Sequence, residues 1–256
     1  MAGNGTIRVL VTGAGGTIGT VLLPRLAEVA EVTTLDVTPL ATAEHSVRHV
    51  EGSIEDVDLL REFSQKTTHV IHLARDDPAS WDALLNVDIS GTRNVFAVAA
   101  ESGVQRVIFA SSTHPVGGLE RDLLRGISED IKEQHAFGEL RPDSEYGVAK
   151  AFGEAYGRFV AEHTSLAVSC LRIGTMRPVD EPERYADEAG FSYIPGGREG
   201  VLRRLRATWL YHDDLWRIVQ EELAASDKFR VRFGVSESPG RFWPLEVRCW
   251  NPAPAS

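Results

Sequence analysis

The stretch VTGAGGTIG, residues 11–19, decides the fold that this sequence predicts. It lies between the β-branched run Ile7–Val11, which has the composition of a strand, and Val21–Val29, where apolar residues recur at helical spacing. Its glycines, spaced three residues apart, have no Cβ, so the chain can turn sharply and approach a pyrophosphate group closely. The N-terminus of the following helix attracts the same anion. The contacts expected in this turn are Gly13, Gly16, Thr17, Ile18 and Gly19.

Asp36 strengthens the prediction of a dinucleotide site. It lies near the end of the second predicted strand, Glu31–Val37, 17 residues after Gly19. A carboxylate at this place accepts hydrogen bonds from the ribose of adenosine. It also repels a 2′-phosphate, and the segment Val37–Pro39 offers no arginine that would bind one. We therefore expect NAD rather than NADP.

Strands and helices alternate along most of the chain. Further strands are predicted at 47–50, 68–73, 106–110, 166–173 and 229–235, and helices at 57–63, 81–100, 145–162 and 213–224. This alternation predicts an α/β fold with a Rossmann-type doubly wound parallel sheet. Such a sheet binds its ligands at the carboxyl ends of its strands.

The organisation after residue 173 is looser. Residues 177–200 combine prolines and glycines with acidic residues, and this composition predicts a long, mobile loop or lid. We expect residues 1–175 to form an NAD-binding Rossmann body that carries the catalytic residues. Residues 176–256 are expected to form a small substrate-binding lobe packed on the same domain, with a lid-like insertion at 179–200.

The composition excludes several classes of function. The 256 residues carry a formal net charge of −10, which argues against binding to nucleic acid or to an anionic membrane. No stretch approaches the ~18 apolar residues of a membrane span. The only cysteines, Cys170 and Cys249, are too few for a disulfide framework and lack the spacing of a metal site. We expect a cytoplasmic protein without a bound metal that acts on a small molecule.

A tyrosine and a lysine four residues apart are the first candidates for chemistry. Tyr146 and Lys150 fall on one face of the predicted helix 145–162, one turn apart. A free tyrosine has a pKa of ~10 and acts as a base near neutral pH only if a nearby cation stabilises its phenolate. Ser111 and Ser112 follow a predicted strand at the carboxyl edge of the sheet, where a hydroxyl group can bind a reacting oxygen.

With these motifs, the sequence resembles the extended short-chain dehydrogenase/reductase family, which includes NAD-dependent epimerases and dehydratases. The resemblance covers residues 6–175 and rests on Thr12-Gly13-x-x-Gly16-x-x-Gly19, Asp36, His72-Leu73-Ala74, Asn86-Val87-x-x-x-Gly91-Thr92-x-Asn94, Phe109-Ala110-Ser111-Ser112 and Tyr146-x-x-x-Lys150. It implies that Tyr146 is the acid/base, that Lys150 holds the nicotinamide ribose and lowers the pKa of the tyrosine, and that Ser112 orients the reacting oxygen. It also implies cofactor contacts by Ser53, Ile54, Leu73, Ala74, Arg75, Asn86, Ser111, Tyr146, Lys150 and Ile173. For Asn86, a structural role in its helix is equally consistent with the sequence.

Within this family, further segments resemble the uronate dehydrogenases. They are Ala110-Ser111-Ser112-Thr113-His114, Arg141-Pro142-Asp143-Ser144-x-Tyr146-Gly147, Lys150-Ala151-Phe152-Gly153-Glu154, Arg172-Ile173-Gly174 and Ala207-Thr208-Trp209-Leu210 before Asp213-Asp214-Leu215. Those enzymes oxidise the C1 hydroxyl group of a hexuronic acid to an aldarolactone with NAD, and the resemblance implies this reaction. It implies substrate contacts by Ser112, Thr113, His114, Tyr146 and Arg204. Arg204 would bind the carboxylate, a role that suits a guanidinium group because it can form two parallel hydrogen bonds.

The sequence departs from the uronate dehydrogenases at four places. Thr113 replaces an asparagine of the substrate pocket, and residues 73–78 bring charge to the pocket mouth. Ser53 replaces the acid that binds the adenine amino group, which should weaken cofactor binding. Residues 179–200 look like an insertion directly before the predicted carboxylate ligand. We expect this insertion and the changes near the pocket to alter specificity.

Two other functions stay open. The same cofactor, tyrosine and lysine serve sugar or sugar-nucleotide epimerases and dehydratases, which retain tightly bound NAD. Against this function, only 82 residues follow Gly174, and Thr113-His114 offers no carboxylate pair for water elimination. The second alternative is a non-catalytic NAD-binding sensor, which the intact serine, tyrosine and lysine argue against. The sequence leaves the sugar, the direction of the reaction and the oligomeric state open.

Overall fold

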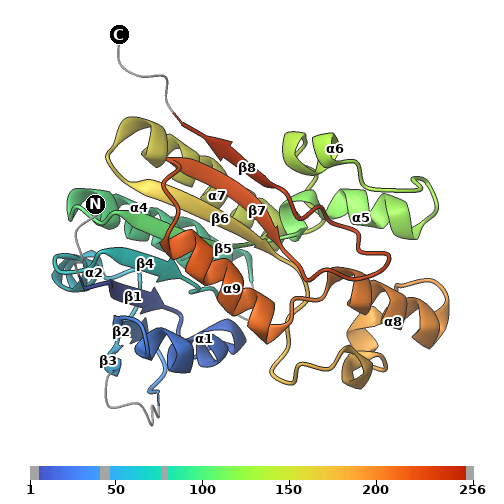
Figure 1. Cartoon of the computed structure of the whole chain (residues 1–256), viewed down its shortest axis with the longest axis horizontal. Coiled ribbons are helices and arrows are strands. Elements are labelled where there is room, and N and C mark those ends of the chain that lie inside the picture. Colours follow the sequence, from blue (N-terminus) through green and yellow to red (C-terminus); the bar gives the residue numbers. More distant parts are fainter. Residues whose placement is uncertain (1–5, 41–46, 77–79, 252–256) are drawn as a thin grey trace.

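One sheet runs through the described part of this computed structural model, residues 6–40, 47–76 and 80–251 (Figure 1). Its eight strands follow the order β3-β2-β1-β4-β5-β6-β7-β8, and all neighbours are parallel except β7 and β8. The strands are β1 (Arg8–Thr12), β2 (Glu31–Asp36), β3 (Val47–Glu51), β4 (His69–His72), β5 (Arg106–Ser112), β6 (Ala167–Ile173), β7 (Phe229–Gly234) and β8 (Val247–Trp250). The strand order reverses between β1 and β4, and ligands bind at this point in such sheets.

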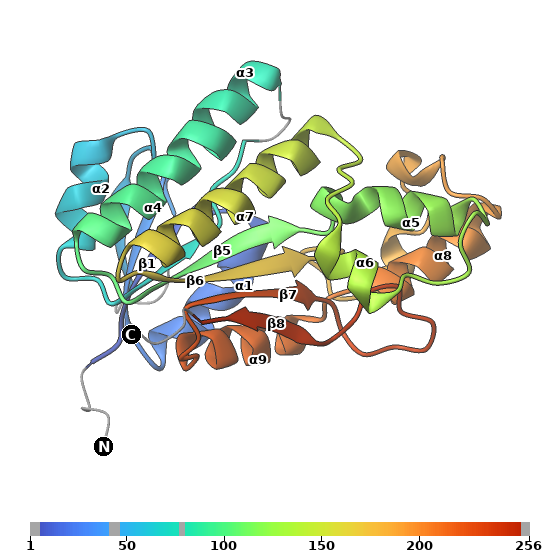
Figure 2. The same ribbon diagram turned by 90° about the horizontal axis from the view of Figure 1, so that it is seen from above.

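Helices cover both faces of the sheet. The α-helices are α1 (Thr17–Ala27), α2 (Val57–Ser64), α3 (Trp81–Ala83), α4 (Thr92–Glu101), α5 (Gly117–Leu124), α6 (Glu133–Gly138), α7 (Glu145–His163), α8 (Gly197–Thr208) and α9 (His212–Leu223). A π-helix, η1 (Leu84–Gly91), joins α3 to α4, and the 3-10 helices are η2 (His114–Val116), η3 (Pro182–Tyr185) and η4 (Ala189–Phe191). Figure 2 shows α2, α4 and α7 on one face, α1 and α9 on the other, and α5, α6 and α8 beyond the carboxyl ends of β5, β6 and β7.

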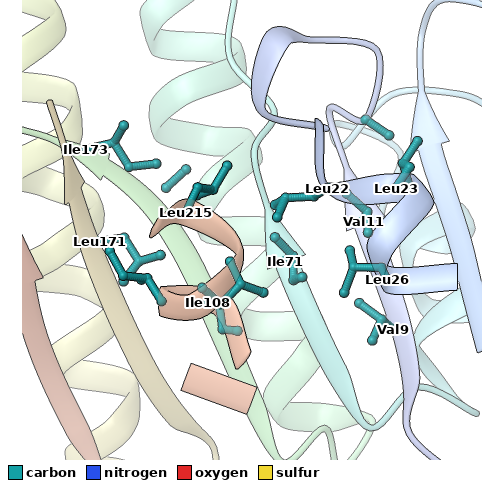
Figure 3. Packing of buried hydrophobic residues seen from close by; sticks show 14 of the residues in the cluster. Val9, Val11, Leu22, Leu23, Leu26, Ile71, Ile108, Leu171, Ile173 and Leu215 are labelled. Atoms are coloured by element: carbon teal, nitrogen blue, oxygen red, sulfur yellow. The ribbon is translucent and has the colours of Figure 1, made fainter. Parts of the chain in front are cut away.

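Alternation along the strands divides the core into two layers. In β1, Val9 and Val11 belong to the layer that contains α1 and α9, whereas Leu10 belongs to the opposite layer. Leu22 of α1 and Leu215 of α9 pack in the same layer as the two valines (Figure 3). All five side chains are at most 1% exposed. Because helices bury both faces, polar groups of the sheet reach a ligand only at its edge.

α7 holds two of the three predicted catalytic residues, Tyr146 and Lys150, in its first two turns. Ser144 caps this helix, because its hydroxyl oxygen accepts a hydrogen bond from the Gly147 N–H at 3.2 Å. Further along, Gly153 lies against β5, where a Cβ would come within 2.4 Å of the Phe109 ring. The absence of a side chain at this position lets the helix approach the strand, which fixes the height of its N-terminal end above the sheet.

Residues 177–200, predicted as a long loop or lid, form a packed segment with short helical turns. They contain η3, η4 and the start of α8, and Phe191 packs with Trp209 in a separate hydrophobic cluster. The Asp180 carboxylate accepts hydrogen bonds from the Trp209 indole and from the His212 N–H, both at 2.8 Å. The segment before α8 is thus mostly irregular, as the sequence predicts, but its aromatic residues pack it against the body; its role as a lid stays a prediction.

The structure confirms the predicted fold class, an α/β fold with a Rossmann-type sheet. The sequence did not reveal α5, which begins with two glycines, nor β8, an antiparallel edge strand with little buried surface. Asp77 and Pro78 of the charged segment 73–78, and residues 252–256, lie outside the described residues. In the described part of the chain, none of the helices is both long and apolar enough to cross a membrane.

His72, the last residue of β4, links β1 to α4. Its Nδ1 lies 2.7 Å from Thr12 Oγ1, and its Nε2 lies 3.0 Å from Thr92 Oγ1. Burial, and after it the positive charge of Lys150, lower the pKa of His72 to about 3. The ring is therefore neutral at neutral pH, with one nitrogen donating and the other accepting a hydrogen bond.

We expect His72 to destabilise the fold as pH falls from 6.5 to about 3. In this window the unfolded chain binds a proton on the imidazole and the folded chain does not, so the free energy of unfolding falls by up to ~1.4 kcal/mol per pH unit. Urea unfolding of the wild type and His72→Gln at about pH 7.5 and about pH 5 measures this effect. Between these pH values the variant should lose ~2 kcal/mol less than the wild type. Equal losses would contradict the role given to His72.

Candidate active site

The turn after β1 is packed too closely for a side chain at its first glycine. Gly13 has a φ of +72°, in the left-handed region, and a Cβ there would lie 2.4 Å from the backbone of Ala74. Its N–H donates a hydrogen bond to the Leu35 carbonyl oxygen at 2.9 Å. The turn therefore touches both the end of β2 and the loop after β4, which places Leu73 and Ala74 beside it.

The N-terminus of α1 and the end of β2 fit the two parts of a dinucleotide. Gly16 stands at the N-cap of α1, so no side chain of this residue competes for the first N–H groups, which remain suited to an anion. At the end of β2, Asp36 accepts hydrogen bonds from the Gly15 N–H at 2.8 Å and from the Thr38 N–H at 2.9 Å. These bonds fix the carboxylate and leave lone pairs for ribose hydroxyl groups.

The other predicted cofactor residues lie near the same edge in different environments. Thr17 and Ile18 begin α1, and Ile173 ends β6. After β3, the Ser53 Oγ accepts a hydrogen bond from the Glu55 N–H at 3.1 Å. The neighbouring Ile54 side chain is 4% exposed and belongs to the core, so it supplies shape rather than a polar contact.

Lys150 is buried and paired with a carboxylate. Its Nζ lies 3.1 Å from Asp88 Oδ1, and the side chains are 2% and 0% exposed. The geometry is that of an ionic contact rather than a directed hydrogen bond. The ammonium also lies 5.1 Å from the centre of the Phe109 ring and 5.4 Å from that of Tyr146. A positive charge is thus held in a nearly dry position next to the candidate acid/base.

The residue opposite Lys150 was not predicted from the sequence. The sequence points to Asn86, but the structure leaves Asn86 exposed and turns Asp88 inward from the same π-helix. The sequence did contain an indication of this partner. Leu84, Asp88 and Val95 lie on one buried face of the helical segment, and a charged residue on a buried face needs a buried partner of opposite charge. Asp88 is thus the partner of Lys150, and the contact of Asn86 with the cofactor stays a prediction.

Tyr146 is half-buried and surrounded by cationic and aromatic groups. The Arg75 guanidinium carbon lies 5.5 Å from the centre of its ring, and the His114 ring meets it edge-on at 5.5 Å between centres. His114 Nδ1 in turn lies 2.8 Å from Asp143 Oδ1. Burial raises the pKa of Asp143, but the hydrogen bonds of His114 and Ser144 and the charges of His114 and Arg121 together lower it by more, so this carboxylate is ionised at neutral pH. It orients the imidazole beside the tyrosine.

The two serines at the end of β5 have different surroundings. The Ser111 hydroxyl donates a hydrogen bond to Glu154 at 2.6 Å, and this carboxylate is paired with Arg172 at 2.7 Å. The Ser112 oxygen instead accepts a hydrogen bond from the His114 N–H at 3.4 Å. Ser111 is therefore committed to a buried network, whereas Ser112 lies next to His114, the neighbour of Tyr146.

A pocket of about 420 Å³ lies beside His114. Its walls come from residues 113–125, from Asp143 and Ser144, and from Tyr193, Pro195 and Arg204. The predicted substrate residues Thr113, His114 and Arg204 thus share one pocket. Glu120, which the sequence did not single out, shares it too, and its Oε1 lies 2.6 Å from Arg204 Nε.

Residues 9–178 match the model of the NAD dependent epimerase/dehydratase family. The chain belongs to this family. The cofactor is NAD, as the phosphate turn and Asp36 predict. The predicted class, an NAD-dependent short-chain dehydrogenase/reductase, is confirmed by the family and the fold.

The relatives of this chain include dehydrogenases of different sugars. It is 33% identical to the L-arabinose 1-dehydrogenase (NAD(P)(+)) of Haloferax volcanii, over 86% of this chain and 83% of the relative. It is 30% identical to the NAD-dependent glucose-6-phosphate dehydrogenase of the same organism, over 93% and 88%. Among solved structures, the uronate dehydrogenase of Agrobacterium tumefaciens matches with 26% identity and a TM-score of 0.74, over 94% and 80%. A mutant of that enzyme has been solved in complex with NAD.

Loss of Asp88 should destabilise the folded protein. Asp88→Ala leaves the Lys150 ammonium buried without its counter-charge, and breaking a buried pair in this way costs about 3–5 kcal/mol. Urea unfolding measures this loss, with Asp82→Ala as the control because Asp82 is an exposed carboxylate six residues earlier. The control should stay within about 1 kcal/mol of the wild type. If Asp88→Ala lost no more free energy of unfolding than the control, Asp88 would not be the stabilising counter-charge of Lys150.

Proposed function

We propose that this protein oxidises the C1 hydroxyl group of a free sugar with NAD and releases the corresponding lactone. The observation that carries this proposal is the position of Tyr146. It lies beside the buried Lys150–Asp88 pair and touches His114, which lines the 420 Å³ pocket. A pocket of this size suits one small ligand. The names of the arabinose 1-dehydrogenase and of the uronate dehydrogenase support a free sugar as that ligand.

In this proposal the turn after β1 and Asp36 hold NAD, which when bound supplies the acceptor for a hydride. Tyr146 removes the proton of the C1 hydroxyl group while the C1 hydrogen leaves with its electron pair, so the C1–O bond becomes the lactone carbonyl. The charge of Lys150 stabilises the phenolate before it takes the proton. The Ser112 hydroxyl holds the reacting oxygen in place.

The same proposal divides the work between the two parts of the chain. Residues 1–175 bind the cofactor and carry the acid/base. Residues 176–256 complete the substrate pocket through Tyr193, Pro195 and Arg204, and add α9, β7 and β8 to the body of the sheet. The segment 179–200 therefore acts as a fixed wall of the pocket in this proposal.

A hexuronic acid, oxidised to an aldarolactone, is the substrate that the sequence motifs favour. Arg204 would bind its carboxylate, and Arg204 does line the pocket. However, Glu120 already engages this guanidinium, so a substrate carboxylate would have to compete with it. The outcome of this competition determines which sugars fit.

A reducing compartment, the cytoplasm, is part of the proposal. Cys170 and Cys249 are both free thiols, and Cys249 is exposed. An exposed thiol persists where glutathione and thioredoxin keep cysteines reduced.

Tyr146→Phe should abolish turnover and leave cofactor binding intact. Loss of the phenolic oxygen removes the acid/base and should lower kcat by ~10²–10⁴-fold. NADH formation with a panel of free sugars measures turnover, and a fluorescence titration with NADH measures binding. Tyr156→Phe is the matched control, because Tyr156 lies on the same helix and packs among the rings of Phe96 and Phe152.

Two results count against the proposed function. An unchanged kcat in Tyr146→Phe would remove this residue from the chemistry. A wild type that binds NADH but forms none with any free sugar would contradict the reaction itself.

A further inference from the structure

A buried ion pair occupies the pocket wall where an anionic sugar would need a free cation. Arg204 Nε lies 2.6 Å from Glu120 Oε1, and the two side chains are 10% and 8% exposed. Nη1 of the same guanidinium donates a hydrogen bond to Thr175 Oγ1 at 3.3 Å, and its Cζ lies 5.7 Å from the centre of the Phe191 ring. Arg204 cannot turn away from Glu120 without losing these contacts.

The charges of the pair cancel within the wall. Burial lowers the pKa of Arg204, but the charge and hydrogen bond of Glu120, together with Tyr193 and Asp143, raise it by more, so the guanidinium stays protonated. A second anion at Arg204 would lie beside the Glu120 carboxylate in a poorly solvated place, and like charges at such a distance repel strongly. The pair therefore does not offer the free cation that recognition of a carboxylate needs.

The pair does offer hydrogen bonds of both kinds. A guanidinium has five N–H groups, and contacts with Glu120 and Thr175 use two of them. Among the described residues, the second carboxylate oxygen of Glu120, Oε2, has no hydrogen-bond partner. Neighbouring hydroxyl groups of a sugar need this combination, because each can both donate and accept. A carboxylate or a phosphate dianion can only accept.

From this arrangement we infer that Glu120 and Arg204 bind two neighbouring hydroxyl groups of a neutral aldose, and that Glu120 excludes hexuronic acids from the site. The inference rests on the proposed oxidation of a free sugar and names the class of that sugar. Arg204 keeps its place in the substrate site but binds hydroxyl groups instead of the carboxylate that the resemblance implies.

The remaining charges of the pocket do not provide a second buried cation. Asp143 is paired with His114. Arg121 and Arg125 are exposed residues of the α5 region, and Arg121 Nη2 donates a hydrogen bond to the Asp143 carbonyl oxygen. A sugar phosphate is the ligand that would use these two exposed arginines, so it belongs in the test.

Substrates that differ only at C6 test the inference on the wild type. They are galactose against galacturonate, and glucose against glucuronate and glucose 6-phosphate. We expect kcat/KM for NADH formation to be at least about tenfold higher for the neutral member of each set. An anionic member that reacts as well as its neutral counterpart would overturn the inference and leave the proposed oxidation standing.

Glu120→Gln tests the residue itself. Glutamine keeps the shape and removes the charge, which frees Arg204 for a carboxylate. We expect the ratio of kcat/KM for galacturonate over galactose to rise by at least about tenfold. Glu199→Gln, an exposed position at the start of the same helix as Arg204, should keep the wild-type ratio. An unchanged ratio in Glu120→Gln would overturn the inference.

Failure of the inference and failure of the proposed function give different results. If Glu120→Gln does not fold, the wild-type comparison alone decides the inference. If the wild type forms no NADH with any sugar, the proposed reaction fails, and calorimetric titration of the wild type and NADH with galactose and galacturonate then tests the inference. Weaker binding of galacturonate would support it, whereas equal or tighter binding, or no binding of galactose, would overturn it.

Discussion

The buried ion pair of Lys150 and Asp88 is the interaction on which the site depends. An ammonium group that is 2% exposed is stable only beside a counter-charge, and the π-helix between α3 and α4 supplies one. This fixed positive charge affects both His72 and Tyr146. Towards the sheet it helps to lower the pKa of His72, whose neutral ring joins β1 to α4. Towards the pocket it lies beside the ring of Tyr146.

In the proposed function, chemistry and specificity come from different parts of the molecule. The carboxyl edge of the parallel sheet holds the cofactor turn, Ser112 and the start of α7, all of which the Rossmann topology brings together. The pocket lies beyond this edge, between α5, α8 and the segment 179–200. Its ion pair joins Glu120 and Arg204, 84 residues apart, so its charge balance can change without any change at the edge. This separation agrees with a family whose members act on different sugars.

Local sequence patterns predicted the sheet and the arrangement of the catalytic helix. Glycine spacing, Asp36 and the four-residue step from Tyr146 to Lys150 each depend on one turn or one helix, which periodicity reveals. Local patterns could not predict ion pairs between residues that are far apart in the sequence, such as Asp88 with Lys150 and Glu120 with Arg204. The motif around Asn86 did not reveal Asp88 as the partner of Lys150, and Glu120 carried no signal because its ion pair forms only when α8 packs against α5. The resemblance identified Arg204 correctly as a pocket residue but could not show that a carboxylate already occupies it.

Hydride transfer from C1 is the central claim, and an isotope label follows it most directly. Wild-type protein is incubated with NAD and a neutral aldose that carries deuterium at C1, and both products are analysed by NMR. We predict deuterium on the nicotinamide ring of NADH and a lactone with no label at C1. Deuterium retained on the sugar, together with inversion at another carbon or with no reaction, would contradict the claim.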